Sequence, residues 1–176
     1  CYRETGAASG GAAAAAAACL PALCVMICRA APRPHAAIHH AHRAVIANGD
    51  IDSPDAALQV LRTTGADAVM VGRAAQGQPW LLGRITKSLD RYGDPGDPVL
   101  TDKCRIVLDH LEALYGFYGE GQGVRIARKH VQWYAEKLNA KHLLDRRCSE
   151  TSDPLAQINW VEDFFQRVAV QEPGHA

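Results

Sequence analysis

Two small polar turns, each directly after a short apolar run, constrain the fold of this chain most strongly. The first turn, Asn48-Gly49-Asp50, follows Ala44–Ala47, and the second, Gly72-Arg73, follows Ala66–Val71. One helix fits between them, so the stretch predicts a strand–helix–strand unit with parallel strands. The carboxyl ends of parallel strands meet at one edge, where α/β folds bind their ligands. We therefore expect the two turns to be neighbours at that edge.

The segment between the two turns carries the signals of a helix start and a helix end. Ser53 is a suitable N-cap, Pro54 suits the first helical position and Asp55 complements the positive end of the helix dipole. Gly65 suits the left-handed conformation that follows a last helical turn. We expect the apolar face of this helix to comprise Ala57, Leu58, Val60 and Leu61.

The composition of the two turns predicts an anion site. Glycine lets the backbone approach a phosphate closely, and an arginine can hold two of its oxygens at once. In (β/α)₈ barrels a phosphate commonly binds at the loops after the last two strands. We expect Arg73 to be buried behind an apolar strand, where it needs a partner. The alternative is a plain turn at Asn48-Gly49, with Arg73 paired to Asp50 or Asp67.

Overall composition narrows the class of partner very little. The 19 basic and 19 acidic residues cancel, so net charge favours neither a nucleic acid nor a membrane. The values of 48% hydrophobic and 22% charged residues are typical of a globular protein. No two of the six cysteines form a C-x-x-C pair, which argues against a zinc site or a disulfide framework and favours a reducing cytoplasm.

Residues 1–43 differ in kind from the rest of the chain. They hold the alanine run Ala12–Ala18, the apolar run Cys19–Cys28 and an Ala/Pro/His/Arg-rich segment. A signal-peptide core, a short membrane span broken by Pro21, and mistranslated sequence are the three interpretations. We expect the third, a low-complexity segment that is disordered or mistranslated. Its histidines are then not a metal site: His35, His39, His40 and His42.

A Gly/Pro/Asp-rich stretch, Tyr92–Thr101, predicts a domain boundary, with a linker at 93–101. The pattern after it is helical, and Gly119–Gly123 is expected to separate the first two helices. Their apolar faces comprise Val107, Leu111, Leu114 and Tyr118, then Ala127, Val131, Tyr134 and Leu138.

A short helix is expected near Lys141–Arg147, and Ser152-Asp153-Pro154 starts a last helix. The inner side of that helix is expected to comprise Leu155, Ile158, Val161, Phe165 and Val168. Residues 102–170 therefore predict a small antiparallel helical bundle, followed by a tail at 171–176.

Basic residues gather in the second helix of this bundle and just after it. Residues 125–147 hold seven basic side chains against two acidic ones, Glu136 and Asp145. Such a stripe suits the phosphate backbone of a nucleic acid, although a solvated helix face is the commoner explanation. His130, Trp133 and Tyr134 lie toward the apolar side, so we expect them to pack rather than to stack on bases.

The stretch VIANGDIDSPDAALQVLRTTGADAVMVGRAAQGQPWLL closely resembles the last two barrel repeats of the bacterial tRNA-dihydrouridine synthases, the B type above all. The resemblance runs from about Val45 to Phe165. It implies an α/β fold, in which residues 44–92 are the last two βα repeats of an FMN-binding (β/α)₈ (TIM) barrel and the helical bundle that follows binds tRNA. The FMN contacts that it implies are Asn48, Gly49, Asp50, Gly72 and Arg73.

The run from Arg125 to His130 is similar to the basic motif with which the C-terminal domain of these synthases clamps tRNA. The RNA contacts that this similarity implies are Arg125, Arg128 and Lys129, with Arg146 and Arg147 as further candidates. We expect tRNA as the partner, with no metal and no membrane, and a monomeric cytoplasmic protein.

The resemblance also implies an activity, the reduction of uridine in tRNA to 5,6-dihydrouridine by FMN, with NADPH as reductant. The proton donor of the family is a cysteine in an Asn-x-x-Cys-Pro-like loop, and no cysteine here has those neighbours. We therefore expect a C-terminal fragment that lacks the catalytic residue, is inactive alone and does not retain FMN. The alternatives are a non-catalytic RNA-binding helical module with an α/β remnant, or another FMN-dependent TIM-barrel oxidoreductase. The basic residues of the helical bundle argue against another FMN-dependent oxidoreductase.

Overall fold

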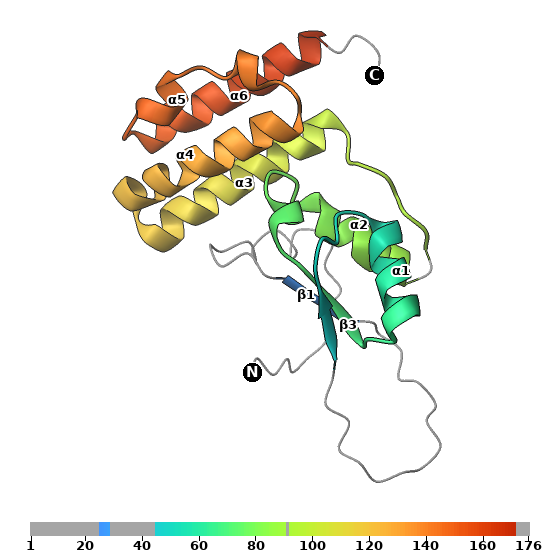
Figure 1. The fold of residues 1–176 in the computed structure, drawn as a ribbon. Helices are drawn as coiled ribbons and strands as arrows, with labels where there is room; N and C mark the ends of the chain where they lie inside the picture. Colours follow the sequence, from blue (N-terminus) through green and yellow to red (C-terminus); the bar gives the residue numbers. More distant parts are fainter. Residues whose placement is uncertain (1–24, 29–44, 91, 172–176) are drawn as a thin grey trace.

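The computed structural model describes residues 25–28, 45–90 and 92–171. An α/β part, residues 45–90, lies beside a helical part, residues 100–171, and residues 92–99 join the two (Figure 1). No helix in these ranges is both long enough and apolar enough to cross a membrane.

The α/β part is built on the expected strand–helix–strand unit. Strand β2 (Ile46–Asn48) pairs in parallel with β3 (Ala68–Val71), so that Ile46 lies opposite Ala68. Helix α1 (Pro54–Thr64) connects them, and α2 (Trp80–Leu89) packs beside α1 on the same side of the sheet (Figure 1). The predicted parallel unit is therefore confirmed.

A third strand, β1 (Val25–Cys28), pairs antiparallel with the other edge of β3 and gives the strand order β1-β3-β2. It lies inside residues 1–43, for which we expected no structure. Both strands are apolar, and the pairing covers backbone groups that an open edge of β3 would expose. The remainder of that segment, with its four histidines, lies outside the described residues.

The caps of α1 are those that the sequence predicts. The Ser53 hydroxyl accepts a hydrogen bond from the Ala56 amide at 3.2 Å, and Pro54 is the first helical residue. Gly65 has φ of 70° and donates to the Leu61 carbonyl. Ala57 and Leu61 are buried against the sheet, because their spacing places them on the inner face of the helix.

The helical part is formed by α3 (Leu100–Tyr118), α4 (Glu120–Lys137), α5 (Arg147–Glu150) and α6 (Pro154–Gln171), with a 3₁₀ turn, η3 (Lys141–Leu143), before α5. Helices α3 and α4 lie along each other, and α6 packs on both (Figure 1). The single short helix expected near 141–147 is therefore two separate turns. The common core includes Val107, Leu111, Leu114, Val131 and Phe165.

Two details of the helical part differ from the sequence prediction. Only Gly119, with φ of 76°, separates α3 from α4, and Gly123 lies inside α4. A Cβ on Gly123 would lie 2.8 Å from the Leu114 carbonyl oxygen, so this glycine permits close packing of the two helices. In α6, Leu155 is 65% exposed, whereas Gln157 and Phe164 are buried. The buried stripe of α6 therefore starts at Gln157, not at Leu155.

A cluster of ion pairs connects residues 92–99 to the α/β part and to the helical part. Arg84 of α2 donates through Nε to Asp94 at 2.9 Å and also pairs with Asp97. Lys103 of α3 pairs with Asp97 at 3.0 Å. The hydrogen bonds from Arg84 and from the Gly96 amide lower the pKa of Asp94 to about 2. The predicted linker thus contacts both α2 and α3. Helix α3 begins at Leu100, which lies inside the bounds predicted for the linker, 93–101.

Candidate functional site

The two turns lie side by side, as their spacing predicts. Nη2 of Arg73, after β3, lies 3.5 Å from Oδ1 of Asp50, after β2. The first turn bends back through Gly49 and Asp50, which have φ of 138° and 32°. The second turn leads directly into a 3₁₀ turn, η2 (Arg73–Ala75). All five residues predicted to contact FMN therefore belong to two adjoining turns at one edge of the sheet.

The prediction that Arg73 is buried is wrong. Its side chain is 89% exposed and that of Asp50 is 98% exposed, because the chain leaves the sheet at Gly72 and Arg73 begins η2 at the surface. The alternative ion pair with Asp50 does form. An exposed pair of this kind stabilises a protein by ~0–1 kcal/mol, so it leaves the guanidinium able to exchange Asp50 for another anion.

The edge has features that fit one side of a phosphate site. Nothing lies within 4 Å of a Cβ built on Gly49, so an anion can approach the backbone there. The exposed Arg73 supplies a fork of donors. Asp50 opposes an anion at the same edge, and Arg73 is the one cation among the five predicted residues.

The basic side chains of α4 differ in their surroundings. Arg125 and Lys129 are exposed, and Nζ of Lys129 lies 4.9 Å from the ring centroid of Trp133. Arg128 is half-buried instead, and its Nη2 donates to the Thr151 carbonyl at 2.6 Å and more weakly to the Glu150 carbonyl at 3.4 Å. Of the three predicted RNA contacts on α4, Arg125 and Lys129 are therefore exposed to solvent, whereas Arg128 is bonded to backbone carbonyls.

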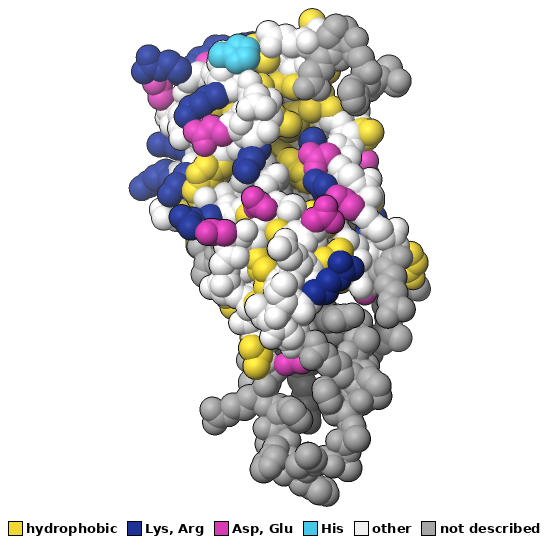
Figure 2. All heavy atoms as spheres, turned by 45° about the vertical axis from the view of Figure 1, so that its right-hand side comes forward, with side chains coloured by type: hydrophobic (Ala, Val, Ile, Leu, Met, Phe, Trp, Pro, Cys, Tyr) yellow, Lys and Arg dark blue, Asp and Glu magenta, His cyan; other side chains and the backbone are white. Residues whose placement is uncertain are grey.

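The two basic residues at α5 differ in a similar way. The Arg146 side chain is 92% exposed and lies 3.5 Å from Glu150. Arg147 holds Asp145 through three side-chain hydrogen bonds and lies over the ring of Trp160, with 5.3 Å to the centroid. These bonds lower the pKa of Asp145 to about 2. On the face drawn in Figure 2, basic side chains gather over the helical half among acidic ones.

An aromatic cluster lies beneath the basic face of α4. Nδ1 of His110 lies 2.7 Å from the hydroxyl of Tyr134, and the ring of His130 meets that of His110 edge-on at 4.8 Å. Burial, with the nearby His110 and Lys129, lowers the pKa of His130 to about 4. The prediction that His130 and Tyr134 pack in the interior is confirmed, while Trp133 is half-buried.

Gln157 is a buried polar residue that the sequence analysis missed. Its Oε1 accepts from the Tyr115 hydroxyl at 2.7 Å, and its Nε2 donates to the carbonyls of Cys148 at 2.9 Å and Val124 at 3.4 Å. The side chain thereby joins α3, α4, α5 and α6. Its place at the start of the apolar stripe of α6 was the only signal in the sequence.

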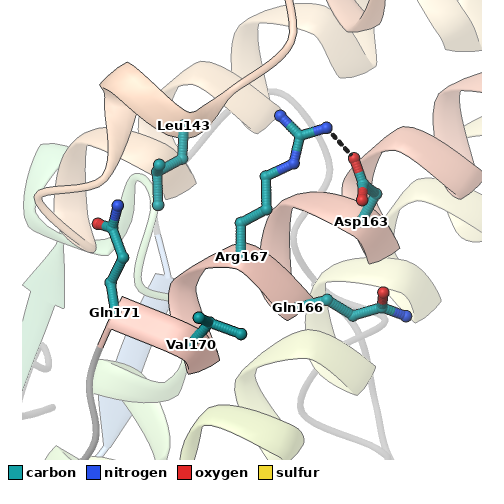
Figure 3. Close-up of a pocket in the computed structure, with 6 residues that line it drawn as sticks. All are labelled: Leu143, Asp163, Gln166, Arg167, Val170 and Gln171. Atoms are coloured by element: carbon teal, nitrogen blue, oxygen red, sulfur yellow. Dashed lines mark hydrogen bonds and ion pairs between the residues drawn. The ribbon is translucent and has the colours of Figure 1, made fainter.

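An open surface groove of about 410 Å³ lies between η3 and α6 and contains none of the predicted site residues (Figure 3). Arg167 pairs with Asp163 at its wall, and its apolar lining comes from Leu143 and Val170. Within the described ranges, no group of three or more His, Cys, Asp or Glu side chains could hold a metal ion. Burial raises the pKa of both Cys104 and Cys148, which is the opposite of what a nucleophile needs.

A strand–helix–strand unit with an exposed arginine at one edge is thus joined to a helical part with exposed basic side chains. Residues 37–169 match the family described as dihydrouridine synthase (Dus), and the chain belongs to this family. The match begins at residue 37, eight residues before the resemblance that we noted in the sequence.

The similar curated proteins are bacterial tRNA-dihydrouridine synthases B. The protein of Xanthomonas campestris pv. campestris is 47% identical over 134 residues, which are 75% of this chain and 40% of that protein. Those of Serratia marcescens and Pseudomonas putida are 42% and 46% identical, over 73% and 69% of this chain and 38% and 36% of their own lengths. The chain therefore spans about two fifths of the length of these relatives.

Proposed function

We propose that this chain is the C-terminal part of a tRNA-dihydrouridine synthase, which reduces uridine in tRNA to 5,6-dihydrouridine with FMN and NADPH. Family membership supports this activity class. The observation that carries the assignment of the cofactor edge is the 3.5 Å approach of Arg73 to Asp50, because it joins the two turns that would share one phosphate.

In this proposal β2, α1, β3 and α2 are the last two βα repeats of a (β/α)₈ barrel, and α3–α6 form its helical bundle domain. Such a barrel needs ~250 residues, and all its strands are parallel. The antiparallel β1 occupies the edge of β3 where a parallel neighbour belongs, so the proposal requires β1 to leave this edge in a complete barrel.

The residues that would hold the FMN phosphate are Asn48, Gly49, Asp50, Gly72 and Arg73. FMN, when bound and reduced by NADPH, would supply the hydride for the uridine ring. These residues form only one side of a flavin pocket, so the isolated chain is expected to be inactive and to lose FMN on purification. Flavin absorbance that persists in the purified chain after desalting would contradict this expectation.

The surface that would contact tRNA comprises Arg125, Lys129 and Arg146, with Arg128 and Arg147 beside them. Arg125, Lys129 and Arg146 are exposed on α4 and at the start of α5, where phosphates can reach them. We propose a monomeric protein that acts on tRNA in the cytoplasm. The second candidate, a non-catalytic RNA-binding helical module, shares this surface and differs in having no flavin chemistry.

The test measures binding of unmodified tRNA to the 176-residue chain over a range of salt concentrations. Arg125→Ala and Lys129→Ala should each weaken binding and reduce the slope of log K against log salt by ~0.7–0.9, the value of one lost phosphate contact. Arg62→Ala, which removes an exposed cation from α1, is the matched control and should change neither quantity. Equal effects of all three variants would show that the binding is not located on α4.

A further inference from the structure

Helix α5 has only four residues, Arg147–Glu150, and cannot hold its own position. A single helical turn is unstable alone, because nucleation fixes several residues for one hydrogen bond. Side chains of other helices must therefore hold α5 in position. Cys148 is buried in the core, and Nε2 of Gln157 donates to the Cys148 carbonyl from α6.

Arg128 holds the other end of this turn. Its Nη2 reaches from α4 to the carbonyl oxygens of Glu150, the last residue of α5, and Thr151, the C-cap. Both carbonyls belong to the end of a helix, where backbone oxygens have no partner within the helix and a cation is favourable. One turn further along α4, Nε2 of Gln132 approaches Oγ of Ser149 at 3.4 Å.

We infer that Arg128 is a positioning residue, which fixes α5 against α4 so that Arg146 faces the same RNA as Arg125 and Lys129. This inference rests on the proposed RNA binding. It departs from the role that the sequence resemblance implies for Arg128, a direct phosphate contact. Nη2 of Arg128 is bonded to both carbonyls and Nε is buried, so only Nη1 is left to bind a phosphate.

The decisive variant is Arg128→Lys, because lysine keeps the charge but its ammonium lies one bond closer to the backbone than Nη2, the atom that bonds both carbonyls. A phosphate contact tolerates this exchange, whereas a positioning role does not. We expect Arg128→Lys to weaken binding of the chain to unmodified tRNA by roughly three- to tenfold, as much as Arg128→Ala does. Arg125→Lys, on the exposed side of the same helix, is the matched control and should bind like wild type.

A second arm tests whether Arg128 acts through α5. In an Arg146→Ala background, Arg128→Lys should cause little further loss of tRNA affinity, because the cation that it positions is already gone. Amide hydrogen exchange of residues 147–151 should be faster in Arg128→Lys, while that of α3 stays unchanged. A variant that merely lowers overall stability would speed exchange throughout the helical part and would add its loss to that of Arg146→Ala.

Wild-type affinity of Arg128→Lys, or slow exchange at 147–151 in that variant, overturns the inference. The failure of the proposed function gives a different result. If Arg125→Ala, Lys129→Ala and Arg146→Ala all leave tRNA binding unchanged, the RNA surface is wrong, and the exchange experiment then still decides whether Arg128 holds α5.

Discussion

Gly77 lies so close to Trp133 that no side chain fits between them. A Cβ on Gly77 would lie 2.3 Å from the carbonyl oxygen of Trp133 and 2.8 Å from Cγ of Lys137. Gly77 belongs to the loop that follows Arg73, and Trp133 belongs to α4. The loop that follows Arg73, at the candidate cofactor edge, therefore packs directly against α4, which carries the candidate RNA surface.

The first prediction is that Gly77→Ala destabilises the chain by about 2–4 kcal/mol. About 1 kcal/mol comes from an alanine at φ of 73°, and the rest from forcing the loop off the backbone of α4. Equilibrium unfolding in urea, followed by circular dichroism, measures the loss. Because Trp133 forms this contact and the ring of Trp80 stacks on that of Tyr134 in α4, 5-fluorotryptophan NMR should show shifts for these two tryptophans and little change for Trp160 of α6.

Gly96→Ala is the matched control for this prediction. Gly96 has nearly the same φ, 76°, but nothing lies within 4 Å of its Cβ position. Its loss should therefore be limited to the backbone contribution of about 1 kcal/mol. If both variants lost the same free energy of unfolding, the close contact of Gly77 with Trp133 would contribute nothing to stability.

The second prediction concerns Gln157, whose amide joins four helices. In Gln157→Leu, the hydroxyl of Tyr115 and the carbonyls of Cys148 and Val124 lose a buried partner. Unpaired buried polar groups cost about 1–3 kcal/mol each, so the loss of three partners predicts a loss of at least about 3 kcal/mol in urea unfolding. Gln166→Leu, at an exposed position of the same helix, should stay within about 0.5 kcal/mol. A Gln157→Leu variant as stable as Gln166→Leu would contradict the buried hydrogen-bond network.

Local signals explain what the sequence could predict. Ser53 and Gly65 act on backbone groups only a few residues away, so the caps of α1 were predictable from their neighbours. The adjacency of Asp50 and Arg73 follows from one βα repeat and the geometry of parallel strands. No long-range contact had to be known for either.

The errors concern residues whose surroundings come from distant parts of the chain. Arg73 was expected to be buried because it follows an apolar strand, but the turn at Gly72 carries it to the surface. Arg128 has the same helical signal as Arg125, yet the α5 carbonyls, 22 and 23 residues away, decide its role. The same reason explains why Leu155 is exposed and Gln157 is buried, because the elements that pack against α6 cannot be deduced from its own sequence.

The third prediction is a pH dependence that originates at His130. Burial, the ring of His110 from α3 and the charge of Lys129 lower the pKa of His130 from 6.5 to about 4. Between these values the unfolded chain binds more protons than the folded chain, so stability must fall as the pH falls from about 6.5 to about 4. The carboxyl groups of Asp94 and Asp145, whose pKa values lie near 2, reduce stability as the pH falls below about 5, so they add to the decline only at its acid end.

Urea unfolding of the chain at a series of pH values between 7 and 4 measures this effect. His130→Gln should lower the stability at pH 7, because it disturbs the packing against Trp133, but should flatten the decline toward pH 4. His142→Gln, which changes an exposed histidine after α4, should keep the wild-type decline. A decline that is equally steep in His130→Gln would mean that His130 titrates in the folded chain much as it does in the unfolded one, and that the aromatic cluster does not exclude its charged form.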